Sequence, residues 1–318
     1  MADYAIGIDI GGTNTKFGVV DRNGHILEQD RTLTNAHESV QEYIEDLYEK
    51  IRPMIDRAGG IDKFAGIGVG APNGNYYTGN IEYAANLKWQ GIIPFASMMA
   101  TRFGMRVKLT NDANAAAMGE MMYGAARGMK HFITITLGTG VGSGIVIDGK
   151  IVLGHDGFAG ELGHTIIRPG GRVHKGTGIH GSLEAYASAT GMRETALEML
   201  TQHPETPSLM RTYKSEDITS QVVYDAAVKG DKIAQEIFEF TGQLLGEALA
   251  NFIMFSSPEA IVLFGGVTKA GDMLLNPTRQ AMEANLVQVF KNKVKLMFSE
   301  LKEADAAILG ASALIWES

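Results

Sequence analysis

The chain contains no cysteine among its 318 residues. Disulfides and thiolate metal ligands are therefore excluded, and the composition is compatible with a reducing compartment. The sequence also lacks any window of about 18 uninterrupted apolar residues, so we expect no membrane span. Its start has neither the basic residues nor the apolar stretch of a signal peptide, which predicts a cytoplasmic protein.

Runs of positive charge are missing as well. The net charge is −8, and lysine and arginine do not cluster, so we expect neither nucleic acid nor a membrane as a partner. A local positive pocket for a polyanion such as ATP is compatible with this balance. Glycine, in contrast, is abundant: several of the 39 glycines fall in tight groups, which mark sharp turns or close approach to a ligand.

One order of strands and turns occurs twice along the chain. An apolar strand, a glycine- and threonine-rich turn, a second strand, an Xaa-Gly turn and a third strand follow one another at the start and again halfway along. This order predicts two related halves, each opening with a three-stranded meander. The predicted strands cover residues 5–10, 17–20, 25–28, 132–137, 145–147 and 150–153.

Helical patterns alternate with short apolar strands elsewhere, which is typical of α/β domains. The length favours two domains, and without a Pro- or Ser-rich linker we expect them to be joined tightly around a cleft. The predicted domains are 1–117 with 303–318, and 118–302. The predicted helices cover 40–55, 113–126, 233–255 and 304–316, and further strands cover 106–109 and 260–264.

The first glycine turn has the residues of a phosphate loop. The pair Gly11 and Gly12 would let main-chain N–H groups face a phosphate. Thr13 adds a hydroxyl, Lys16 a cation, and Asp9 could help to hold Mg²⁺ through water. A plain hairpin turn is the alternative, although it would need neither the Asp nor the Thr. The segment is neither a Walker loop nor a dinucleotide fingerprint, because it opens a hairpin and not a helix.

The second glycine turn is the counterpart of the first. Gly138, Thr139 and Gly140 begin a cluster that is followed by a strand, which argues against a dinucleotide-binding fingerprint. Two such hairpins could hold the phosphates of ATP between them. Between the two turns, Asn111 and Asp112 stand after a strand and before an alanine-rich helix. They could supply a base for an acceptor hydroxyl, or simply cap the helix.

Taken in order, these motifs resemble the ROK family of sugar kinases and sugar-responsive repressors. GELGH at 160–164 and PEAIVLFGG at 258–266 complete the pattern, which spans nearly the whole chain. The resemblance implies an actin-like ATPase fold, in which two RNase-H-like domains enclose ATP, Mg²⁺ and a sugar. It places Gly265 and Gly266 at the nucleotide and implies a homodimer or tetramer.

The resemblance also implies roles for individual side chains. Asp112 falls at the position of the catalytic base and Asn111 at a sugar ligand. Carboxylates, amides and imidazole suit sugar hydroxyls because each can accept a hydrogen bond from a defined OH. The other implied substrate-binding residues are Asn73, Asn86, Glu161, His164 and Glu184.

The sequence departs from the family in one loop. Most members bind a structural zinc there with three thiolates and the histidine of the Glu-x-Gly-His motif. Lysine and neutral hydroxyls cannot replace thiolates, so we predict no zinc and a loop that keeps its shape by hydrogen bonds. His164, His174 and His180 could form a different metal site, or all remain unliganded. The three cysteine positions hold Lys175, Thr177 and Ser182.

The implied reaction is ATP-dependent phosphorylation of a hexose at O6. Glucose is the expected hexose, and N-acetylmannosamine, N-acetylglucosamine, fructose and allose are alternatives within the family. A repressor is disfavoured, because those members carry a helix-turn-helix domain ahead of the first glycine motif, whereas Asp9 lies close to the start of this sequence. A non-catalytic sugar-binding regulator is the remaining alternative.

Overall fold

The computed structural model describes residues 2–316. The chain divides into two compact units. Unit 1 comprises Met1–Lys130, Gly144–Gly160 and Ser299–Ser318, and unit 2 comprises His131–Ser143 and Glu161–Phe298.

Unit 1 is built on a five-stranded sheet with the order β3-β2-β1-β4-β7. β1 pairs antiparallel with β2, and β2 pairs antiparallel with β3, as predicted for the opening meander. β4 then runs parallel to β1, and β7 parallel to β4, so the carboxyl ends of these three strands meet at one edge. The strands are β1 (Tyr4–Ile10), β2 (Asn14–Asp21), β3 (Ile26–Leu33), β4 (Phe64–Gly70) and β7 (Val107–Thr110), with a small pair β5 (Ile81–Glu82) and β6 (Ile92–Ile93).

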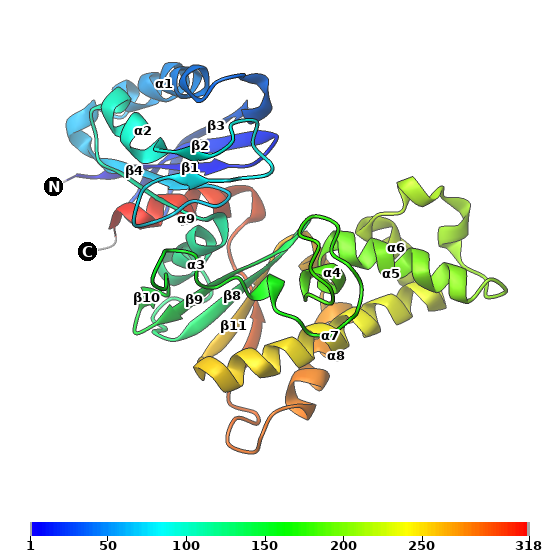
Figure 1. The fold of residues 1–318 in the computed structure, drawn as a ribbon. Coiled ribbons are helices and arrows are strands. Elements are labelled where there is room, and N and C mark those ends of the chain that lie inside the picture. Colours follow the sequence, from blue (N-terminus) through cyan, green and yellow to red (C-terminus); the bar gives the residue numbers. More distant parts are fainter. Residues whose placement is uncertain (1, 317–318) are drawn as a thin grey trace. The chain divides into compact units, whose positions relative to one another are not determined.

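Helices cover both faces of this sheet (Figure 1). α1 and α2 lie on one face, and α9 lies across β1 and β4 on the other, with α3 packed against α9. These helices are α1 (Val40–Arg57), α2 (Phe95–Phe103), α3 (Asp112–Tyr123) and α9 (Glu303–Trp316).

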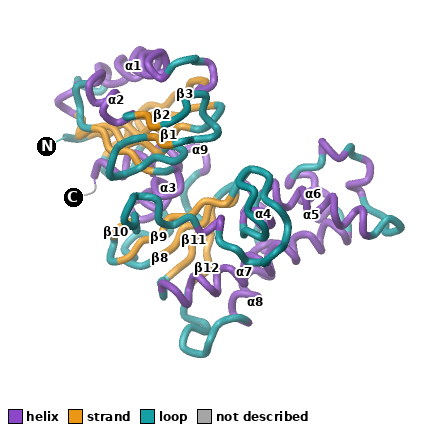
Figure 2. The backbone as a smooth tube through the Cα atoms, viewed as in Figure 1, coloured by secondary structure: helices purple, strands orange, loops and turns teal. Residues whose placement is uncertain are grey.

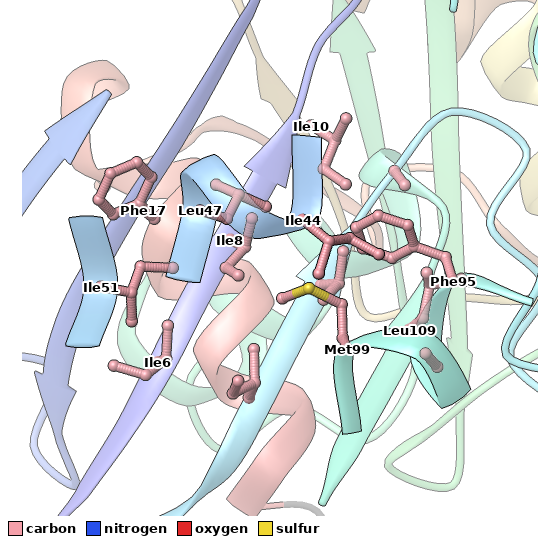
Figure 3. Close-up of a cluster of buried hydrophobic side chains, with 14 of the residues drawn as sticks. Ile6, Ile8, Ile10, Phe17, Ile44, Leu47, Ile51, Phe95, Met99 and Leu109 are labelled. Atoms are coloured by element: carbon pink, nitrogen blue, oxygen red, sulfur yellow. The ribbon is translucent and has the colours of Figure 1, made fainter. Parts of the chain in front are cut away.

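The core of unit 1 lies between α1, α2 and the sheet. α1 begins with a capping box, in which Ser39 and Glu42 satisfy each other's main-chain N–H groups. Its apolar stripe, which includes Ile44, Leu47 and Ile51, then packs onto the strands (Figure 3). The helix predicted over residues 40–55 is therefore confirmed.

Two glycines let α9 approach the sheet closely. A Cβ on Gly7 would lie 2.1 Å from the carbonyl oxygen of Ile308, and one on Gly68 would lie 1.9 Å from that of Ala311. Any side chain there would push α9 away. The composition of β1 and β4 therefore reflects close packing on this face and not only strand formation.

Unit 2 contains most of a second five-stranded sheet, of order β10-β9-β8-β11-β12 (Figure 2). β10 pairs antiparallel with β9, whereas β8, β11 and β12 are parallel. The order mirrors that of the first sheet, so the prediction of two related halves is confirmed. The division between the units falls within β9. The strands are β8 (Phe132–Leu137), β9 (Val141–Ile147), β10 (Lys150–Ile151), β11 (Ala260–Phe264) and β12 (Lys295–Phe298).

Helices make up much of the rest of unit 2. The longest is α7, which packs against α8 and has more than half of its residues buried. This contact depends on glycine, because a Cβ on Gly246 would lie 2.3 Å from the carbonyl oxygen of Thr278. The helices are α4 (Glu184–Ala187), α5 (Ala189–Gln202), α6 (Ser220–Val228), α7 (Lys232–Ser256) and α8 (Asp272–Ala284).

The predicted elements differ from the structure mainly at their ends. The helix predicted over 113–126 ends at Tyr123, because Gly124 leaves the helical conformation and the Glu120 carboxylate accepts the Ala125 N–H at 2.8 Å. The strand predicted over 150–153 pairs only over two residues. In the described part of the chain, every helix is too short or too polar to cross a membrane.

Candidate active site

Two aspartates stand at one edge of the unit 1 sheet. Asp9 pairs in register with Gly70 of β4, and Gly70 pairs with Thr110 of β7. Asp112 follows two residues later, as the first residue of α3. A Cβ on Gly70 would lie 3.9 Å from Asp9 Oδ1 and 3.7 Å from the Asp112 Cα. The parallel strands therefore bring together two carboxylates that lie about a hundred residues apart in sequence.

The surroundings make both aspartates hard to ionise. Burial, together with the negative charge of Asp112, raises the pKa of Asp9 from 3.8 to about 6, against the opposing pull of Lys16 on the neighbouring strand. Asp112 keeps access to solvent, but the protein atoms around its carboxyl group raise its pKa by desolvation, and the Ala113 N–H, 2.8 Å from Oδ1, only partly offsets this. A nearby cation would favour the ionised forms.

The first glycine turn lies beside Asp9. The Gly11 N–H donates to the Asn14 carbonyl at 3.0 Å and closes the turn between β1 and β2. Gly12 packs directly on Asn86, since a Cβ there would lie 2.7 Å from the Asn86 carbonyl oxygen. Thr13 is exposed at the tip of the turn. The structure therefore places the predicted phosphate-loop residues next to one predicted sugar ligand.

Asn111 caps α3. Its Oδ1 accepts the Asn114 N–H at 2.7 Å, and its backbone is extended. The capping interpretation is therefore confirmed for Asn111, while its side-chain NH₂ group remains available to a ligand. The cap also fixes the start of the helix, and so the position of Asp112 in its first turn.

Asn73 and Asn86 are both exposed, but only Asn73 is tied to the main chain. Its backbone has a positive φ of 50°, and its Nδ2 donates to the carbonyls of Glu82 and Tyr83 at 2.9 and 3.2 Å. The amide of Asn73 thus fixes its own loop and has only Oδ1 to offer a ligand. Asn86 is also exposed, and its backbone is held against Gly12.

The second glycine turn in unit 2 lies on the start of α5. The Gly138 N–H donates to the Gly140 carbonyl at 3.0 Å, and the Gly138 carbonyl accepts the Ala189 N–H at 2.8 Å. The Thr190 hydroxyl donates to the Thr139 carbonyl at 3.0 Å. Space for a Cβ on Gly138 is open, so a ligand can approach the main chain at this point.

The end of β11 packs beside the same turn. Gly265 has a φ of 108°, and a Cβ on it would lie 2.6 Å from the Leu137 carbonyl oxygen. Gly266 then begins a 3₁₀ turn, Gly266–Ala270, at the wall of a cavity of about 200 Å³. Sequence reasoning found the two glycines but missed the helices that complete the cavity. Its other lining residues are Met192, Ser220, Gln221, Tyr224, Phe238, Val267, Lys269 and Ala270.

The predicted sugar ligands of unit 2 form one cluster around Glu184. Oε2 of this nearly buried carboxylate accepts the Val141 N–H at 2.7 Å. Oε1 lies 3.0 Å from His174 Nε2 and 4.0 Å from His164 Nδ1. His164 Nε2 in turn lies 3.8 Å from Glu161 Oε2. The structure thus brings Glu161, His164 and Glu184 together, and adds His174 to them.

Gly140 links this cluster to the second glycine turn. A Cβ on Gly140 would lie 2.4 Å from Glu184 Oε2. Only glycine therefore lets the carboxylate reach the Val141 N–H. A predicted phosphate-loop residue and a predicted sugar-binding residue therefore pack directly against each other.

The cysteine-free loop is held by hydrogen bonds, as predicted. The His174 N–H donates to the Ile179 carbonyl at 2.8 Å, the Thr177 N–H donates to the His174 carbonyl at 3.2 Å, and His174 Nδ1 lies 2.9 Å from the Thr177 hydroxyl. The Nδ1 atom of His180 instead lies 3.3 Å from the Gly171 carbonyl oxygen.

The residues present do not fit a zinc ion. Lys175 is mostly exposed and pairs with Glu194 at 3.3 Å, and the hydroxyls of Thr177 and Ser182 are neutral. His164 Nδ1 is buried and makes no hydrogen bond within residues 2–316, but a single nitrogen is not a zinc site. Within the described residues, no group of three potential His, Asp or Glu ligands is arranged to hold a metal.

Comparisons with known proteins found relatives over nearly the whole chain. A glucokinase of Halalkalibacterium halodurans is 36% identical over 324 residues, which cover 99% of this chain and 96% of the relative. A glucokinase of Thermotoga maritima is 32% identical, with coverage of 98% and 97%. A crystal structure of a ROK family glucokinase from Streptomyces griseus, in complex with glucose and AMPPNP, matches with a TM-score of 0.80 at 30% identity over 98% of each chain.

The structural match, together with the paired order of the two sheets, confirms the predicted actin-like ATPase fold of two RNase-H-like domains. The model of the ROK family matches residues 5–318. Because this match and the two sequence relatives span nearly the whole sequence, the chain belongs to the ROK family.

Proposed function

We propose that the protein is an ATP-dependent hexose kinase that phosphorylates glucose at O6. The observation that carries the proposal is the pair of carboxylates, Asp9 and Asp112, at the edge of the unit 1 sheet, in a chain whose nearly full-length relatives are glucokinases. One carboxylate can take up a proton while the other supports the phosphate-bound cation, which is what transfer to an alcohol requires.

Asp112 is the proposed general base. Its pKa is raised above the usual range by desolvation, so the carboxylate is a better proton acceptor than an exposed aspartate. It would take the proton of the sugar's O6 hydroxyl as that oxygen attacks the γ-phosphorus. The Asn111 cap fixes the start of α3 and so holds the base in place.

Asp9 is the proposed carboxylate of the Mg²⁺ site. Its raised pKa reflects burial and repulsion from Asp112, and a divalent cation would offset both, so these residues fit the ion. When bound, Mg²⁺ neutralises charge on the phosphate oxygens. Lys16, opposite Asp9 on β2, adds a positive charge on the same side.

In unit 2, main-chain groups of Gly138 and Gly140 are the proposed phosphate contacts of the nucleotide. In unit 1, Gly11 and Gly12 are proposed for the same role. The cavity beside Gly266 is lined by aromatic, aliphatic and polar side chains, which suits a nucleotide base. The AMPPNP complex of the Streptomyces griseus relative supports ATP as the donor.

The proposed sugar ligands are polar side chains from both units. In unit 2, Glu161 and Glu184 lie within 4.0 Å of His164 and form one cluster of charged and polar groups with it. In unit 1, Asn86 offers its side-chain amide, Asn111 offers its NH₂ group, and Asn73 offers its amide oxygen. Glucose is favoured by the glucokinase relatives, whereas N-acetylhexosamines, fructose and allose remain alternatives. The proposal also includes the predicted functional domains (1–117 with 303–318, and 118–302), a homodimer or tetramer, and a cytoplasmic location.

The test is ADP release with Mg·ATP against glucose, fructose, allose and N-acetylhexosamines, with a control that lacks sugar. We expect turnover with glucose well above the control. Preference for another hexose would correct the substrate but keep the mechanism. If no sugar raised ADP release while calorimetry still detected sugar binding, the kinase proposal would be wrong and a binding protein would replace it.

The variant Asp112→Asn tests the assignment of the base. It keeps the shape of the side chain but cannot accept the proton, so kcat should fall by about 10²–10⁴-fold. Glucose binding measured by calorimetry should change little. Turnover within a fewfold of the parent protein would refute the role of Asp112.

A further inference from the structure

The Glu184 carboxylate is fixed at both of its oxygens. Oε2 accepts the Val141 N–H at 2.7 Å, and Oε1 lies 3.0 Å from His174 Nε2. Only 12% of the Glu184 side chain is exposed. Because a glutamate side chain has several rotatable bonds, two anchors are needed to hold both its position and its rotation.

The His174 ring is itself held from its other side. Nδ1 lies 2.9 Å from the Thr177 hydroxyl, whose oxygen also accepts the Ile179 N–H at 3.3 Å. A carboxylate can only accept hydrogen bonds, so the contact with Glu184 requires a hydrogen on His174 Nε2. With Thr177 donating to Nδ1, the neutral imidazole has that hydrogen. Both ring nitrogens are therefore used.

Thr177 occupies one of the positions at which most family members have a zinc-binding cysteine. We propose that the chain from Thr177 through His174 to Glu184, here called the 177–174–184 chain, positions the Glu184 carboxylate in place of the zinc. In this proposal His174 is a positioning residue for sugar binding. It does not touch the sugar or the reacting atoms.

Three observations support this proposal. The donor set of the loop does not fit zinc. Thr177 makes a direct contact with His174, and so joins the chain. The second loop histidine, His180, points to the Gly171 carbonyl and takes no part. The loop has therefore exchanged metal coordination for a specific set of hydrogen bonds and not merely lost its metal.

The proposal rests on the proposed function, in which Glu184 accepts a hydrogen bond from a sugar hydroxyl. A carboxylate held in advance binds this hydroxyl without first being ordered. Without His174, Oε1 would be free to turn, and its nearest remaining partner would be His164 Nδ1 at 4.0 Å. Replacing His174 should therefore weaken the binding of the sugar and leave the binding of ATP unchanged.

The central experiment compares His174→Leu with His174→Gln. Leucine fills similar space but cannot donate a hydrogen bond, so the KM for glucose should rise by about 10- to 100-fold, the range for loss of a hydrogen bond to a charged group. The KM for ATP should stay within about twofold. Glutamine can place an amide NH₂ near Glu184 Oε1 and should recover most of the affinity for glucose.

Two further variants test the outer end of the chain. Thr177→Val removes the hydroxyl and should raise the KM for glucose by severalfold, whereas Thr177→Ser keeps the hydroxyl and should not. His180→Ala is the matched control, because this histidine lies in the same loop and its Nδ1 lies 3.3 Å from the Gly171 carbonyl oxygen. Its KM for glucose should be unchanged.

Several outcomes would overturn the proposal. An unchanged KM for glucose in His174→Leu would do so, as would an equal rise in His180→Ala or a failure of glutamine to recover affinity. If His174→Leu does not fold, the comparison of Thr177→Val with Thr177→Ser tests the proposal on its own. Zinc in the purified protein, with loss of glucose affinity on adding a zinc-selective chelator in excess Mg²⁺, would also refute it. If the parent protein phosphorylates no sugar, the proposed function fails, and the same comparison is made on the Kd for glucose by calorimetry.

Discussion

Replacing Asp9 by asparagine should make the protein more stable at neutral pH. Burial and the charge of Asp112 raise the pKa of Asp9 from 3.8 to about 6, so the folded protein holds this proton more tightly than the unfolded chain does. The stabilisation that comes with the proton is fully present below pH 3.8 and is lost as the pH rises to about 6. Asp9→Asn is neutral at every pH and does not lose it.

The size of the effect follows from the change in proton affinity. A tenfold change in affinity corresponds to about 1.4 kcal/mol, so the rise from 3.8 to about 6 gives at most about 3 kcal/mol. Asp9 is partly accessible to solvent. Solvent screening therefore lowers the expected gain in stability to about 1–2 kcal/mol. The difference in free energy of unfolding between variant and parent should grow from about pH 4 and level off above about pH 6.5.

Urea denaturation between pH 4 and pH 8, without Mg²⁺ or nucleotide, measures this difference. Both tryptophans, Trp89 and Trp316, belong to unit 1, so their fluorescence reports the unit that contains Asp9. Asp62→Asn, at an exposed site of the same unit, is the matched control and should give a flat difference. A flat or inverted profile for Asp9→Asn would refute the reasoning.

Three other substitutions have expected outcomes. Gly68→Ala should lower the free energy of unfolding by about 1–3 kcal/mol in urea denaturation, since its Cβ would lie 1.9 Å from the carbonyl oxygen of Ala311; an unchanged midpoint would mean that α9 moves freely. Gly140→Ala should raise the KM for glucose about tenfold, because its Cβ would lie 2.4 Å from Glu184 Oε2; normal kinetics would show that this approach is not needed. Ser39→Ala should cost about 1 kcal/mol of stability by removing the cap of α1, and Ser39→Asp should not.

The sequence predicted the elements of the fold well because their signals are local. Alternating apolar strands, glycine turns and helical spacing act over a few residues, and α1, α7 and β11 lie within two residues of their predicted ends. The end of α3 was less predictable, since it depends on the capture of the Ala125 N–H by a side chain, Glu120, inside the helix.

The sequence also determined which chemistry is possible at the site. The order of the glycine turns, the Asn111–Asp112 pair and the Glu-x-Gly-His motif indicated a sugar kinase, and the lack of cysteine excluded thiolate ligands. It left open whether Asn111 caps a helix or meets a ligand, because both roles call for the same residue in the same place. The structure shows that its oxygen caps α3.

Only the tertiary structure decided how distant residues act on one another. The raised pKa of Asp9 comes first from its burial and then from the charge of Asp112, and the need for glycine at position 140 arises from Glu184. The contact of His174 with Glu184 joins residues ten apart through a loop whose path is set by its own hydrogen bonds. Periodicity and turn residues carry no information on such contacts, because these depend on how strands and loops pack and not on the order of residues within them.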